Sequence, residues 1–223
     1  MKKLISLILI CVMCLSFASC GGSTQGGDDG NNQGGDNGNT QGNNIPSVSD
    51  PLKVESAESQ DAVTVVFSRL PENAQDLQNV DFSNEFQVAA SIAAVLCYYE
   101  TDPDKCFEMM NVLKGPEDIS EFDKSFIKEQ FSQYPYVARS YIIGSNPDND
   151  YSYESVMINI AEGPYSRTED GYVELWLQSG GADSPRSVKL RKKESTNEWF
   201  LFSDTYKGLL AGIRQPAGSD PWK

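Results

Sequence analysis

The sequence predicts an α+β fold, because apolar segments with helical spacing come first and segments that alternate apolar and polar residues come later. The helical patterns lie within residues 85–131, and the alternating patterns lie between residues 156 and 203. Elements grouped in this way favour helices packed on an antiparallel sheet over a parallel βαβ arrangement. We therefore expect a helical hairpin plus a third helix on one face of an antiparallel meander of about four to five strands.

The predicted helices carry start and stop residues. Ser83 or Asn84 can cap the first helix, and the alanine-rich run that follows has so broad an apolar arc that a buried central helix is expected. Pro103 suits the first turn of the second helix, which Gly115 ends. The third helix is expected to begin after Ser120.

The predicted strands are short and separated by residues typical of turns. They are residues 62–67, 137–143, 156–160, 172–178, 187–193 and 198–203. The last four are joined by short connections, which favours an antiparallel meander.

The N-terminus indicates export. Two lysines precede an apolar run at residues 4–17, which is too short to span a bilayer comfortably, and the small residues after it lead into Cys20. This resembles a bacterial lipoprotein signal, although Phe17 stands where that pattern usually has Leu. We expect residues 1–19 to be the signal peptide and Cys20 to be lipidated. The alternative is an ordinary secretory signal cut after Ala18 or Ser19, with Cys20 incidental.

The remaining chain divides into a tether and a domain. Residues 21–44 contain only Gly, Asn, Gln, Asp, Ser and Thr, so they have no apolar side chain to bury. We therefore interpret residues 20–50 as the lipidated cysteine and a flexible linker, and residues 51–223 as a single globular domain.

Composition excludes several functions. The chain has 32 acidic and 18 basic residues, a net charge of −14, and would be repelled by nucleic-acid phosphates. It contains no histidine, which removes Ser-His-Asp and Cys-His nucleophile systems and most catalytic zinc sites.

Two cysteines belong to the predicted domain. Cys97 lies near the end of the first predicted helix and Cys106 lies about one turn into the second, so a tight hairpin can bring them to disulfide distance. The alternative is a pair of buried thiols that act as small apolar groups.

Two short motifs fit non-functional interpretations better. Ser125 and Lys128 match a Ser-x-x-Lys pattern, but its partner motifs are missing and the segment reads as an amphipathic helix. Asn146, Asp148 and Asp150 alternate as in a calcium loop, but the positions that need Gly and Glu hold Tyr151 and Met157. We assign no catalytic, cofactor or metal residue, and no cofactor.

Aromatic residues give the candidate ligand surface. Tyr172, Glu174 and Trp176 alternate with Val173 and other apolar residues, and so lie together on one face of a predicted strand. Aromatic rings beside a carboxylate can stack on a sugar or grip a peptide. The alternative, which the need to pack three helices favours, is that helices or the tail cover this face too.

Several segments carry a family resemblance. They include residues 97–100 and 106–109, residues 179–186 followed by 189–191, residues 198–201, and the closing residues 213–216 with 220–222. Together these segments resemble an uncharacterised family, a domain of unknown function, in secreted and lipid-anchored proteins from gut anaerobic bacteria. The resemblance implies location and kinship but no activity.

These observations lead to two functional hypotheses. The first is a lipoprotein outside the cytoplasm, anchored to a bacterial membrane, whose non-catalytic domain binds a glycan, a peptide or an envelope protein. The second is a carboxylate-dependent hydrolase of cell-wall or dietary glycan, which needs an acidic pair in a cleft with one raised pKa.

Overall fold

The computed structural model describes residues 50–219. Its strands are β1 (Val54–Glu58), β2 (Val63–Phe67), β3 (Val156–Glu162), β4 (Tyr172–Leu177), β5 (Arg186–Lys193) and β6 (Glu198–Leu201). Its α-helices are α1 (Glu85–Cys97), α2 (Pro103–Lys114) and α3 (Glu121–Gln133). Short 3₁₀ segments join them: η1 (Asp76–Asn79), η2 (Tyr98–Glu100), η3 (Ala138–Tyr141), η4 (Pro147–Asn149), η5 (Thr205–Leu210) and η6 (Ala217–Ser219).

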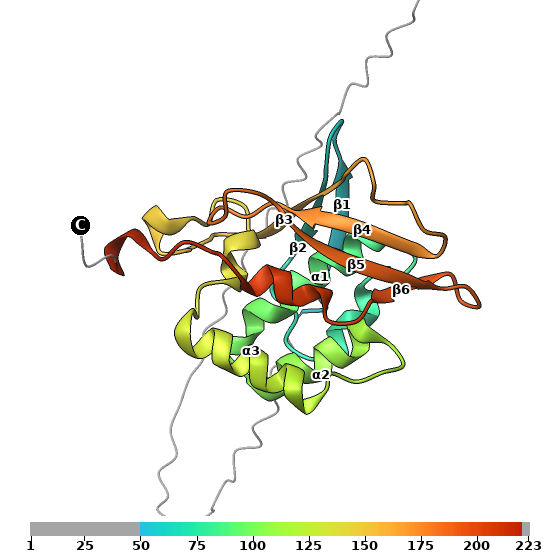
Figure 1. The fold of residues 1–223 in the computed structure, drawn as a ribbon, viewed down its shortest axis with the longest axis horizontal. Helices are drawn as coiled ribbons and strands as arrows, with labels where there is room; N and C mark the ends of the chain where they lie inside the picture. The colour runs from blue at the N-terminus through green and yellow to red at the C-terminus, as the bar shows by residue number, and fades with distance from the viewer. Residues whose placement is uncertain (1–49, 220–223) are drawn as a thin grey trace, which may run out of the picture. The chain divides into compact units, whose positions relative to one another are not determined.

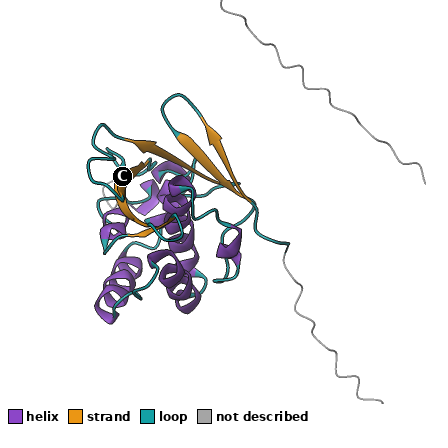
Figure 2. Cartoon of the chain, turned by 90° about the vertical axis from the view of Figure 1, so that its right-hand side faces the viewer, coloured by secondary structure: helices purple, strands orange, loops and turns teal. Residues whose placement is uncertain are grey.

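The six strands form one antiparallel sheet in chain order, β1-β2-β3-β4-β5-β6. The three helices are inserted between β2 and β3, yet these two strands are direct neighbours, with Val65 opposite Ile158. Figure 1 shows α1, α2 and α3 together on one side of the sheet, and Figure 2 shows the same two layers from the side. The molecule is therefore the α+β sandwich that the order of patterns predicted, with six strands.

Alternation along the strands decides which side chains enter the core. The fully buried positions that face the helices are Val65, Ile158, Ile160, Val173, Leu175, Leu177, Val188 and Leu190. The residues between them face away from the helices. The core cluster runs from Leu52 to Ile213, within the compact unit Val48–Lys223. This unit carries its own core, and we expect it to fold alone.

Helix α1 is the centre of the core. The Asn84 side chain caps it by accepting hydrogen bonds from the backbone N–H groups of Phe86 and Gln87. Every residue from Val88 to Leu96 is fully buried, and the helix contacts all six strands. Its many alanines permit this close approach on most sides, as the breadth of the apolar arc predicted.

The other two helices follow their capping residues. The Asp102 side chain accepts from Lys105 N–H, and Gly115 ends α2 with a φ of 84° that favours glycine. Ser120 caps α3 by accepting from Asp123 N–H.

Three expectations need correction. The strand predicted at residues 137–143 is wrong, because residues 138–141 form the 3₁₀ turn η3 and only the next residue, Ile142, makes a bridge, with Ile158. Strand β1 was not predicted, because four of its five residues are exposed and leave no apolar alternation. The alternative that helices also cover the second sheet face is wrong as well, since the three described α-helices pack together on one face.

Candidate functional site

The sheet face opposite the helices carries the candidate ligand residues. Tyr172, Glu174 and Trp176 on β4 all lie there, because the alternate residues of that strand are fully buried. Tyr172 and Glu174 are half-buried among their neighbours, whereas Trp176 is 37% exposed. The strand therefore presents the three side chains in a row on one surface, as the sequence predicted.

Strand β5 extends this surface. Across the β4–β5 pair, Tyr172 lies opposite Arg191, and Glu174 lies opposite Lys189. Directly opposite residues on one face of an antiparallel pair are close enough for their side chains to interact. The register thus places two cationic side chains next to the aromatic and acidic groups of β4.

Phe202 completes a packed cluster just after β6. Its ring meets that of Tyr172 edge to face, with centroids 5.0 Å apart and planes at 84°. Lys189 Nζ lies 4.6 Å from the Tyr172 ring centroid and 5.7 Å from that of Phe202. The Lys189 ammonium is also 2.8 Å from a carboxylate oxygen of Glu169, and this hydrogen bond raises the pKa of Lys189. These contacts hold the ring of Tyr172 in place.

Arg191 differs from Lys189 in having a free charge. Its side chain is exposed, its guanidinium lies 5.7 Å from the Tyr172 ring, and it forms no ion pair with any residue of the described range. A guanidinium beside an aromatic ring offers several hydrogen-bond donors in a fixed plane. We call the six residues Tyr172, Glu174, Trp176, Lys189, Arg191 and Phe202 the outer-face cluster.

The Trp176 indole rests on the backbone of the β3–β4 loop. A Cβ added at Gly163 would come 3.0 Å from Trp176 Nε1, so glycine makes room for the ring. Ser166 fixes this loop, because its hydroxyl accepts from Gly163 N–H at 2.8 Å and donates to the carbonyl of Glu174. The indole therefore contacts this loop on one side, and the rest of the ring is partly exposed.

The two sequence motifs have structural roles. Ser125 lies on the exposed side of α3, and its hydroxyl donates to the Glu121 carbonyl one turn earlier. The Asn146 side chain accepts from Asp148 N–H at 2.9 Å inside the capping box of η4. Within residues 50–219 no cluster of three or more Cys, Asp or Glu side chains is arranged to hold a metal ion.

Cys97 and Cys106 are both buried and are free thiols in the structure. The Cys106 thiol donates to the Val95 carbonyl oxygen over 3.4 Å. Burial raises the pKa of Cys97 to about 12 and also raises that of Cys106. Both thiols are thus kept protonated and act as small apolar groups in the described fold.

Three acidic groups have lowered pKa values. The hydrogen bond from Arg69 lowers the pKa of Asp76, and the bond from Lys207 lowers that of Asp204. Burial alone would raise the pKa of Asp123, but hydrogen bonds from Lys207 and Ser120 outweigh it, so this pKa is lowered too. These three carboxylates are structural ion-pair partners. Their pKa values are lowered, whereas a carboxyl group that acts as a general acid has a raised pKa.

Cys20 and the linker lie outside the described residues. Among the helices that the structure does describe, none combines the length and apolar character that crossing a bilayer requires.

Fold and site together define a two-layer α+β domain with an aromatic and cationic sheet face open to solvent. Residues 69–217 match the family model described as Domain of unknown function (DUF6935), and the chain belongs to this family. Neither the curated proteins nor the solved structures contain a match to this chain.

Sequence reasoning found half of the outer-face cluster. It missed Lys189, Arg191 and Phe202, although the same alternation was visible: Val188 and Leu190 are the inward residues of β5, so the residues that follow them face outward. The edge-to-face contact of Phe202 with Tyr172 depends on how β6 returns beside β5, which no spacing within one strand indicates.

Proposed function

We propose that this protein is an envelope lipoprotein outside the cytoplasm, whose domain binds a ligand without transforming it. In this proposal Cys20 carries the lipid, and residues 21–50 tether the domain of residues 51–223 to the membrane. Its Gly-rich part, residues 21–44, spans roughly 25–30 Å on average, which holds a domain off the lipid while leaving it free to rotate.

The observation that carries the binding proposal is the open outer-face cluster. The helices cover only the opposite face, and Trp176 is left 37% exposed. The Glu174 carboxylate is next to this ring in the row on the same face of β4, and the free Arg191 guanidinium lies at the other end of the row, opposite Tyr172. An exposed ring on a face that also carries charged groups is typical of recognition surfaces, where the ring contributes apolar contact and the polar groups set orientation.

The cluster is also preorganised. Tyr172 is held between Lys189 and Phe202, and the Trp176 indole is supported by Gly163. Side chains that are already ordered lose less conformational entropy on binding than mobile ones. A sheet face built in this way suits the planar or extended ligands that the sequence suggested, a glycan or a peptide.

Binding is tested with glycan and peptide arrays and the unit Val48–Lys223. We expect specific binding that Trp176→Ala abolishes. The matched control is Phe122→Ala, which removes an aromatic ring that is 75% exposed on α3, in the helical layer. Binding that survives Trp176→Ala, or is lost equally in the control, would place the site elsewhere.

Two further measurements separate the parts of the proposal. Release of reducing sugar from a bound glycan would favour the carboxylate-dependent hydrolase instead. Incorporation of a labelled fatty acid into the full chain, abolished by Cys20→Ala, tests the anchor. An unlabelled chain would overturn the anchor and leave the binding proposal to be decided by the arrays.

A further inference from the structure

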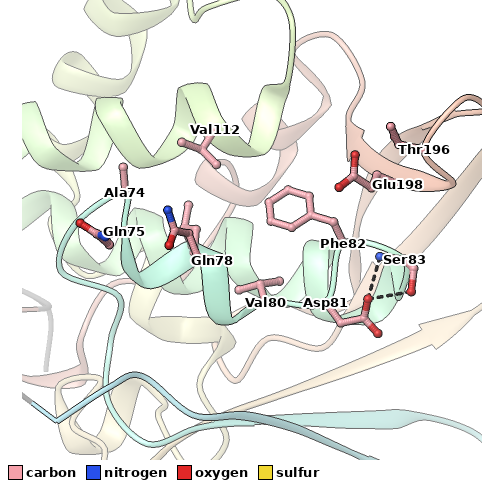
Figure 3. A pocket seen from close by; sticks show the side chains of 11 residues that line it. Ala74, Gln75, Gln78, Val80, Asp81, Phe82, Ser83, Val112, Thr196 and Glu198 are labelled. Atoms are coloured by element: carbon pink, nitrogen blue, oxygen red, sulfur yellow. Dashed lines mark hydrogen bonds between the residues drawn. The ribbon is translucent and has the colours of Figure 1, made fainter.

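A groove of about 770 Å³ lies beside the β5–β6 hairpin, and none of its lining residues belongs to the outer-face cluster. Its lining residues are Ala74, Gln75, Leu77, Gln78, Val80, Asp81, Phe82, Ser83, Val112, Thr196 and Glu198. They come from η1 and the residues on both sides of it, from α2, and from the β5–β6 hairpin (Figure 3). The volume lies within the usual range for ligand sites.

The wall of the groove is fixed by hydrogen bonds. The backbone N–H of Trp199 on β6 donates to the Phe82 carbonyl oxygen at 2.8 Å. The N–H of Asp81 donates to the side-chain oxygen of Gln87 on α1 at 3.0 Å. The segment is therefore tied to both the sheet and the central helix, and the groove is formed before any ligand arrives.

Apolar groups form one part of the groove. Leu77 and Val80 are buried at its base, and Val112 on α2 is 37% exposed. The half-buried Phe82 ring packs against Phe200 with centroids 5.6 Å apart, which holds it in position. In Figure 3 the ring points into the space between Val112 and Glu198.

The ionisable lining residues are both acidic. The Asp81 carboxylate is occupied, since it accepts from the N–H of Ser83 at 2.9 Å and from its hydroxyl at 2.6 Å. Glu198 makes no ion pair or side-chain hydrogen bond with the described residues, and in Figure 3 its carboxylate points toward the Phe82 ring. A free carboxylate beside an aromatic ring complements an ammonium or guanidinium group.

We propose that this groove binds a basic peptide segment. A Lys or Arg side chain lies between the Phe82 ring and the Glu198 carboxylate, and an adjacent apolar side chain packs on Val112. At the far end the exposed amides of Gln75 and Gln78 supply donors and acceptors for the peptide backbone. The net charge of −14 attracts such a segment from a distance.

The test measures fluorescence polarisation of a labelled Leu-Lys-Leu-Lys-Leu-Lys peptide with the unit Val48–Lys223. The comparison peptide replaces each Lys by Glu. We expect binding of the basic peptide alone, weakened by added salt, because screening reduces charge attraction. Equal binding of the acidic peptide would overturn the proposal. So would the absence of binding up to about 1 mM protein, since the Kd would then exceed about 1 mM.

Glu198→Gln tests the carboxylate without changing its size. We expect it to weaken binding at least about fivefold, the scale of a lost charge-assisted hydrogen bond. The control is Glu194→Gln, an exposed glutamate in the turn of the same hairpin, which removes the same charge outside the groove. If the two variants weakened binding equally, the peptide would be attracted by net charge alone, and the proposed site at Glu198 would be wrong. Thermal unfolding of each variant confirms that it is folded, and Trp176→Ala is expected to bind this peptide normally.

Discussion

Arg69 and Asp76 form a bidentate ion pair: Nη1 of Arg69 lies 2.7 Å from Oδ2 of Asp76, and Nη2 lies 2.8 Å from Oδ1. Oδ2 of the same carboxylate also accepts from Glu72 N–H at 2.9 Å. Arg69 follows β2, and Asp76 begins η1, whose residues line the groove. The ion pair therefore ties the wall of the groove to the end of a core strand.

Replacing Asp76 by Asn is expected to lower the free energy of unfolding by about 1–3 kcal/mol. The side chains of Arg69 and Asp76 are only 22% and 10% exposed, so the change leaves a partly buried guanidinium with a weaker partner. Urea unfolding measures the effect. Asp204→Asn, which removes the more exposed partner of Lys207, is the control and is expected to change stability by less than about 1 kcal/mol.

The same ion pair predicts a dependence of stability on pH. The hydrogen bond from Arg69 lowers the pKa of Asp76 in the folded protein below its unfolded value of about 3.9. A lowered pKa contributes stability above the unfolded pKa, and this contribution is lost as pH falls through the folded pKa. Between pH 7 and pH 3 the wild-type protein should thus lose more stability than Asp76→Asn. Parallel losses in the two proteins would show that Asp76 does not carry the effect.

The helices were predictable because their capping chemistry is local. Asn84, Asp102 and Ser120 each accept a hydrogen bond from a backbone N–H within three residues, so the sequence alone contains both partners. The same holds for β4, where alternation places Trp176 outside and its neighbours inside.

Elements set by distant contacts were not predictable. Residues 137–143 have the aromatic and β-branched composition of a strand, but the buried Tyr141 donates to the Leu209 carbonyl at 2.8 Å, and tertiary packing of this kind overrides propensity. The groove is a stronger case. It joins Phe82, Val112 and Glu198, which come from three separate parts of the chain and have no common spacing.

The two thiols give a prediction about chemistry in the folded state. Cys97 and Cys106 are buried free thiols, and burial raises the pKa of Cys97 to about 12, so neither should react with iodoacetamide in the native protein. After unfolding in urea without a reductant, we expect both thiols to be alkylated, as counted by intact mass. Alkylation that appears only when a reductant is added would instead establish a disulfide between them.

Gly181 packs against Tyr151 and Ile213 with no room for a larger side chain. A Cβ at this position would overlap the Tyr151 hydroxyl and would come 2.7 Å from Ile213 Cγ2. Tyr151 cannot easily move away, because it is fully buried, stacks on Tyr136 with centroids 5.1 Å apart, and donates to the Arg214 carbonyl at 2.6 Å.

Gly181→Ala should therefore cost about 1–3 kcal/mol, the usual penalty for overpacking a filled site. Its control is Gly208→Ala, where the nearest atom to an added Cβ, the Ser187 carbonyl oxygen, lies at an ordinary 3.8 Å. That change should stay within about 0.5 kcal/mol of the wild-type protein in urea unfolding. If the two variants were equally stable, the tight packing of Tyr151 against the Gly181 backbone would not contribute to folding.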